Sequence, residues 1–227
     1  MTDLFADIWP MLVSIAIHPV AITLALVLAG RAHGAKSAAC FAGGFCAGLL
    51  ATCAVGRLLA LVLHGPGGGD SRHIAAWMTL AAGVIVALWA LSLVVLRANR
   101  SRLDFLSRSI PRMLSLSMGG LVLHGFKGAA LNPKDLAVSL AFGARLGVLD
   151  EGQERAIMAV AVFLFLIAGT LPLLAPAIVS GLGTAPARER LDGLSEQIRG
   201  HYLLASAVVL VVMGLNMIRS AMERLAG

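Results

Sequence analysis

Charged and aromatic side chains are scarce in this chain of 227 residues. Asp, Glu, Lys and Arg together make up 13% of it and aromatic residues 5%, whereas 59% of the residues are hydrophobic. A water-soluble domain needs more polar surface than this composition supplies. We therefore expect an all-α integral membrane protein, with residues 1–227 forming a single transmembrane domain.

Motifs for several other function classes are also missing. The chain has three cysteines, at positions 40, 46 and 53, but no C-x-x-C pair, which weakens a redox or zinc hypothesis. No nucleophile, metal-ligand set or second acid supports His124 as a catalytic group, so we expect neither an enzyme nor a metal or cofactor site. No nucleotide-binding motif and no basic surface interleaved with aromatics is present, so neither nucleotide-driven transport nor nucleic-acid binding is expected.

Long apolar runs take the place of these motifs. A helix needs about 20 apolar residues to cross the hydrocarbon core, and six segments qualify as candidate spans. The first is not expected to be a cleaved signal peptide, because acidic residues rather than basic ones precede it. The six segments are 8–30, 38–63, 77–96, the interrupted region 114–144, 157–181 and 203–218.

Basic residues are distributed unequally over the loops between these segments. The loops 31–37, 97–113 and 182–202 contain ten Lys and Arg, whereas the opposite side of a six-span protein contains five. Cytoplasmic loops carry the excess of Lys and Arg. We predict that these three loops are cytoplasmic and that both termini are external.

One polar cluster interrupts the region 114–144. Its ionisable and amide residues are His124, Lys127, Asn132, Lys134 and Asp135, and two of the only three lysines of the chain are among them. Ionisable groups at membrane depth are costly and persist mainly at pathways or beside partners. The run Asn132-Pro133-Lys134-Asp135 also predicts a helix start, with Asn as N-cap, Pro at N1 and Asp at N3.

The same residues allow simpler interpretations. Lys127 could snorkel to an interface, and Lys134 could pair with Asp135 without any function. Arg57 could either reach outward or line a cavity. If the cluster does face a cavity, its cations outnumber Asp135, and the positive end of a half-helix starting at Pro133 adds to them, so an anionic substrate is expected.

The two halves of the chain also resemble each other. A shift of 114 residues, the difference between positions 18 and 132, places His18-Pro19 over Asn132-Pro133. Each half, roughly 1–110 and 111–227, would hold three spans, and an odd number gives the halves opposite topology. The sequence therefore predicts two inverted three-helix repeats with a broken first helix in each, and His18 joins the candidate site. A chance coincidence of prolines remains the alternative.

At these residues the chain resembles the glycopeptidolipid-addressing and sulfolipid-addressing protein family, a branch of the lysine exporter superfamily. The resemblance rests on 17–19 with the apolar run that follows, on 41–44, and on the box 130–136 with its Asn-Pro-Lys motif. The family usually has Asn after that motif and a small residue before the first Pro, so Asp135 and His18 are departures.

The resemblance implies a six-span inner-membrane protein that helps to move envelope glycolipids, or their lipid-linked precursors, in actinobacteria. Membrane lipids and proteins of envelope-lipid synthesis or export are the implied partners, and a homodimer is kept as an alternative to a monomer. Two other functions stay open: a small-solute exporter, as in the wider superfamily, and a scaffold that transports nothing. In the transport hypothesis Lys127, Asn132, Lys134, His18, His124 and Arg57 bind substrate, Asp135 couples a proton, and Pro19 and Pro133 break the helices.

Overall fold

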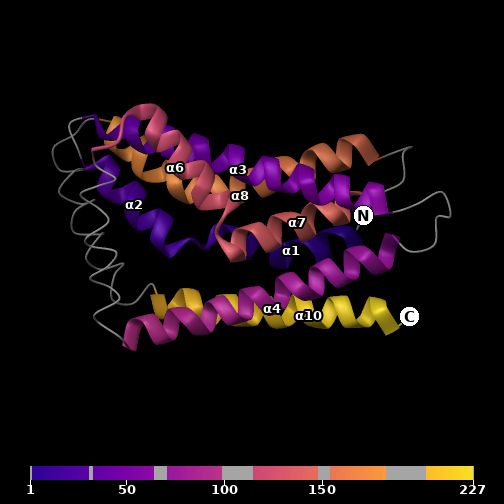
Figure 1. Ribbon diagram of the computed structural model, residues 1–227. Helices are drawn as coiled ribbons and strands as arrows, with labels where there is room; N and C mark the ends of the chain where they lie inside the picture. Colours follow the sequence, from indigo (N-terminus) through magenta and orange to yellow (C-terminus); the bar gives the residue numbers. More distant parts are fainter. Residues whose placement is uncertain are drawn as a thin grey trace.

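The computed structural model describes residues 2–30, 33–63, 71–98, 115–147, 154–182 and 203–226. Within these ranges all regular elements are α-helices, which pack lengthwise into one bundle (Figure 1). The first and last helices place both described ends of the chain at the same end of the bundle (Figure 1). The helices are α1 (Thr2–Ala16), α2 (Pro19–Ala29), α3 (Gly34–Leu63), α4 (Ser71–Ala98), α6 (Met118–Ala130), α7 (Pro133–Gly147), α8 (Glu154–Gly181) and α10 (Leu203–Ala226).

The first candidate span is broken, as expected from Pro19. Helix α1 stops at Ala16, α2 begins at Pro19, and the two axes differ by 43°. Pro19 has no amide hydrogen to continue the helical ladder, but its fixed φ suits the first position of a new helix. The amide of Ile22 donates to the carbonyl of His18, so α2 starts a hydrogen-bond ladder of its own.

The region 114–144 contains the second break, with the caps that the sequence predicts. Helix α6 ends at Ala130, and the side-chain Oδ1 of Asn132 accepts a hydrogen bond of 3.1 Å from the amide of Lys134. Pro133 is the first residue of α7, and the amide of Leu136 donates to the carbonyl of Asn132. Both helix breaks lie midway along the bundle (Figure 1).

Glycines bring α3 into backbone contact with both α6 and α7. A methyl group at Gly44 would overlap the carbonyl of Val122, and one at Gly125 would overlap that of Phe41. Further along α3, Gly143 meets the carbonyl of Cys53 in the same way, and Gly147 packs against the Cβ of Ala60. From Gly48 with Phe126 to Gly56 with Leu140, the contacts advance in the same direction along both segments, so α6 and α7 run parallel to α3 (Figure 1). Small residues permit such close approach in membranes.

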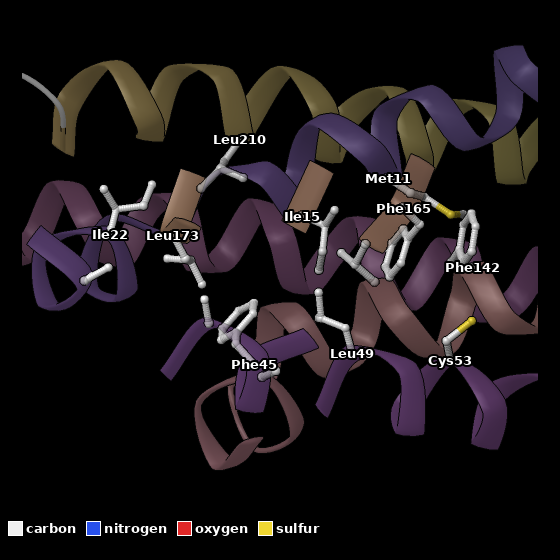
Figure 2. Packing of buried hydrophobic residues seen from close by; sticks show 14 of the residues in the cluster. Met11, Ile15, Ile22, Phe45, Leu49, Cys53, Phe142, Phe165, Leu173 and Leu210 are labelled. Atoms are coloured by element: carbon white, nitrogen blue, oxygen red, sulfur yellow. The ribbon is translucent and has the colours of Figure 1, made fainter. Parts of the chain in front are cut away.

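The remaining helices complete the bundle around an apolar core. Helices α4 and α10 lie side by side and antiparallel (Figure 1), and Gly83 packs against the backbone of Gly214. Helix α8 packs on α2, where Ser180 Oγ donates to the Ala29 carbonyl at 2.7 Å. Phe142 and Phe165 stack in the core with centroids 4.1 Å apart (Figure 2). The outer surface is apolar too, since Val62 and Trp77 are 75% and 60% exposed.

This surface agrees with an integral membrane protein. Four helices are long and apolar enough to cross a membrane, and a fifth crossing is added if α1 and α2 count as one bent span. The α6–α7 pair is not among them, and its stretch from 127 to 145 contains four charged residues. The described helices also extend beyond several predicted limits: α3 starts at Gly34, α4 at Ser71 and α8 at Glu154, and α10 ends at Ala226.

Two adjacent glycines of α3 provide a test of this packing. A methyl group at Gly44 would overlap the Val122 backbone, whereas nothing lies within 4 Å of one at Gly43. We expect Gly44→Ala to destabilise the protein by about 1–3 kcal/mol through overpacking, and Gly43→Ala to be neutral or slightly stabilising. Thermal unfolding in detergent measures both. Equal melting temperatures for the two variants would contradict the α3–α6 contact.

Candidate functional site

The two helix breaks meet at a cluster of buried polar side chains. Lys134, in the first turn of α7, donates from Nζ to the Ser14 carbonyl in the last turn of α1, at 2.8 Å. Its Nζ also lies 3.5 Å from Nδ1 of His18, the residue just before α2. The break in α1–α2 makes this carbonyl available, since the last four carbonyls of a helix have no partner within it.

Asp135 lies between two basic side chains. Its Oδ1 is 2.6 Å from Lys134 Nζ and 3.1 Å from His18 Nδ1. These are ion-pair distances, although neither contact to Oδ1 has hydrogen-bond geometry. Lys134, Asp135 and His18 are 1%, 0% and 3% exposed, so the cluster is withdrawn from lipid as well as from solvent.

The walls around this cluster are apolar. Phe45 of α3 packs edge-on against the His18 ring with centroids 4.7 Å apart. Ile15, Phe45 and Leu49 belong to the core shown in Figure 2. Charges in such surroundings are expensive, and an ion pair compensates only part of the desolvation penalty. Replacing a buried pair with apolar residues is often neutral or stabilising, so stability does not account for this one.

Several polar atoms at the site have no hydrogen-bond partner among the described residues. They come from α1, from the α1–α2 break and from α7, and all are buried: Ser14 Oγ, His18 Nε2, both carboxylate oxygens of Asp135 and Ser139 Oγ. Each such atom costs about 1–3 kcal/mol when it stays unsatisfied. The site therefore has more hydrogen-bonding capacity than its own residues use, which suits binding of a polar group.

The other predicted site residues either flank the cluster or lie at its periphery. Asn132 caps α7 with its side chain, Pro19 is buried and Pro133 is exposed at the surface. On α6, His124 is half-buried with its ring centroid 6.4 Å from that of Phe41. Lys127 and Arg57 are both exposed. The structure thus brings together His18, Lys134 and Asp135 and leaves His124, Lys127 and Arg57 at the periphery.

Two serines of the site were missed by the sequence analysis. Ser14 is four residues before His18 and Ser139 is four residues after Asp135, and both are fully buried. In α7 this spacing puts Ser139 on the same helix face as Asp135. Ser14 and His18 are instead brought near each other by the break, since α1 ends at Ala16. A search for hydroxyls one turn away from the ionisable residues would have found them. No group of three His, Cys, Asp or Glu capable of holding a metal occurs among the described residues.

Comparison with protein-family models gives a match over residues 8–223, which includes both helix breaks and nearly every described helix. The matching model is that of Sap, sulfolipid-1-addressing protein. The chain belongs to this family. The resemblance seen at the Asn-Pro-Lys box is thereby confirmed at the level of the family. No curated protein and no solved structure matched the chain.

Membership of this family implies a membrane-associated, lipid-addressing role. His18 and Asp135 contact each other in the site. The site of this chain thus contains a His–Asp contact beside Lys134.

Proposed function

We propose that the protein is a transporter or flippase that moves an anionic envelope lipid, or a lipid-linked precursor, across the inner membrane. The observation that carries this proposal is the buried cluster of His18, Lys134 and Asp135 at the meeting point of two helix breaks. Broken helices in corresponding positions form the binding sites of many transporters. The lysine exporter superfamily provides the analogy for transport, and its small-solute exporters are the alternative substrate class.

Six crossings are part of the proposal, and the helix directions support them. Helices α6 and α7 run parallel to α3 and extend from the level of Gly44 to that of Ala60. Those 16 residues of α3 rise about 24 Å, most of the hydrocarbon thickness. With α6–α7 counted as one crossing, the number is even, in agreement with two chain ends on the same side of the bundle (Figure 1).

An inverted repeat agrees with the same contacts. Helix α3 (span two) packs on α8 (span five), where Leu49 meets Gly169, and α4 (span three) packs on α10 (span six), where Gly83 meets Gly214. Both pairs are antiparallel (Figure 1). Span one runs parallel to span five, as span four does to span two. These are the directions that a two-fold axis in the membrane plane produces. The positive-inside bias further predicts external termini, which labelling of single cysteines by an impermeant reagent in intact cells would test.

The proposed transport step is an exchange of partners at Lys134. Its ammonium pairs with Asp135 in the closed site. An anionic head group that enters at the break would replace that carboxylate as the partner of Nζ. The positive end of α7 and the unsatisfied hydroxyls of Ser14 and Ser139 would bind its oxygens. An unpaired ammonium at this depth is costly. Lys134 is therefore expected to be paired at all times, either with the Asp135 carboxylate or with the head group.

Reconstituted vesicles test the function directly. We expect the purified protein to accelerate transbilayer movement of fluorescent phosphatidylglycerol at least tenfold over protein-free vesicles, with a smaller effect on phosphatidylcholine. Dithionite quenching of the outer leaflet gives the rate. Acceleration of neither lipid by protein that is folded and inserted would favour a scaffold. Export of a soluble anion without lipid movement would favour the small-solute alternative.

A further inference from the structure

We propose that His18 is the proton-binding group of this site and that it takes up one proton when an anionic head group binds. The proposal rests on the anion-transport function proposed above and adds the coupling ion and its residue. The sequence had suggested Asp135 for this role, from the pairing of that residue with Lys134. The structure adds His18 as a third member of the cluster and points to it instead.

In the neutral ring, His18 Nδ1 can satisfy either Asp135 or Lys134, but not both. Nδ1 lies 3.1 Å from Asp135 Oδ1 and 3.5 Å from Lys134 Nζ. A ring nitrogen that carries hydrogen can donate to the carboxylate, whereas one without hydrogen can only accept from the ammonium. Nε2 has no partner among the described residues. In the neutral ring, one of the two contacts at Nδ1 is therefore always unsatisfied.

Protonation of the ring removes this conflict when Lys134 has an external partner. Imidazolium forms an ion pair with Asp135 through the protonated Nδ1 and offers a second donor at Nε2. Asp135 then keeps a cationic partner after Lys134 turns to the head group. Without the proton, Asp135 would lose its ammonium while a second anion enters the same buried site.

Charge counting leads to the same conclusion. With neutral His18, the closed site contains one ammonium and one carboxylate and is neutral. Adding a monoanion alone gives a net charge of −1, and adding a proton alone gives +1, in a site that is almost completely buried. Adding both restores neutrality. Because unbalanced charge is penalised there, proton and anion favour each other's binding.

No other charged group competes for this role among the described residues. The groups that act electrostatically on His18 are Asp135 and Lys134, both from α7. Helix α3 contributes the uncharged ring of Phe45, and α1 contributes the backbone of Ile15. The charge on His18 therefore depends on whether Lys134 and Asp135 are paired with each other. Anion binding changes this pairing.

The test measures proton uptake when short-chain phosphatidylglycerol binds to the purified protein in weakly buffered detergent. Its phosphodiester keeps a single charge between about pH 5.5 and 8.5, so any uptake belongs to the protein. We expect about one proton per lipid bound, and an affinity that rises as the pH falls, by up to about tenfold per pH unit. The His18→Gln variant should bind with an affinity that does not depend on pH and without proton uptake.

Two further variants serve as controls. His73→Gln alters an exposed histidine at the start of α4 and should behave as the wild type. A variant with Gln at all five other histidines should retain the uptake, and this variant decides the question if His18→Gln does not fold. Unchanged uptake in His18→Gln, or its loss in the five-site variant, would overturn the assignment. Absence of both lipid binding and lipid movement in the wild type would instead refute the transport function itself.

Discussion

Lys134→Ala is expected to abolish lipid movement in vesicles, with a rate at least 100-fold below the wild type. Lys134 Nζ is the cation at which the proposed exchange takes place, and its contacts to Ser14 and Asp135 connect the two helix breaks. The same substitution leaves the Asp135 carboxylate buried without its ammonium, at a cost of about 3–5 kcal/mol in unfolding free energy. Loss of activity could therefore reflect loss of structure.

A double variant separates these two effects. Lys134→Met with Asp135→Asn removes both charges, and we expect it to recover most of the lost stability while remaining inactive. Lys134→Arg keeps the charge but changes its size and donor geometry, so a partial loss is expected. Thermal unfolding and dithionite quenching, carried out on the same preparations, provide both quantities. Wild-type rates in a folded Lys134→Ala protein would remove the site from this part of the chain.

Asp135→Asn is expected to bind phosphatidylglycerol more tightly and to move it more slowly. The carboxylate competes with the substrate for Lys134, since both pair with the same ammonium. Removing the competitor should strengthen binding by about tenfold or more, corresponding to 1.4 kcal/mol for each factor of ten. Release of the lipid from Lys134 should then be slow, because no carboxylate of the protein takes its place as the partner of the ammonium. The pH dependence of transport should change as well, since His18 loses its ionic partner.

Ligand-dependent stability provides the measurement for this variant. Without lipid, Asp135→Asn should unfold at a lower temperature than the wild type, because Lys134 is buried without a counter-charge. Saturating phosphatidylglycerol should raise its melting temperature by more than it raises that of the wild type. Ser37→Ala, a change on a part of α3 remote from the break, is the control. A weaker lipid effect in Asp135→Asn than in the wild type would contradict the exchange.

The helix breaks could be predicted from the sequence because they depend on local chemistry. Proline cannot donate a backbone hydrogen bond, and Asn132 is a favoured cap, so the ends of α6 and α7 follow from a few adjacent residues. The family could be recognised for the same reason, from the short segments 17–19, 41–44 and 130–136. Helix lengths were less well predicted, since apolar composition indicates the lipid-embedded part and not where the helix ends.

The composition of the site depended on tertiary contacts that the sequence does not display. His124 and Lys127 share a turn of α6 and were natural candidates, yet α6 turns them toward Phe41 and the surface. Lys134 contacts Ser14, which is 120 residues away in the chain. Only the repeat suggested that positions 18 and 132–135 would be neighbours, and it could not indicate that a backbone carbonyl would be a partner.

That backbone carbonyl has an evolutionary consequence. Because Lys134 contacts the main chain of residue 14, substitution of Ser14 preserves this hydrogen bond whatever side chain replaces it. Insertion or deletion of one residue between 14 and 18 would rotate the carbonyl by about 100° around the axis of α1 and remove it from Lys134. Related chains should therefore keep the length of this junction unchanged.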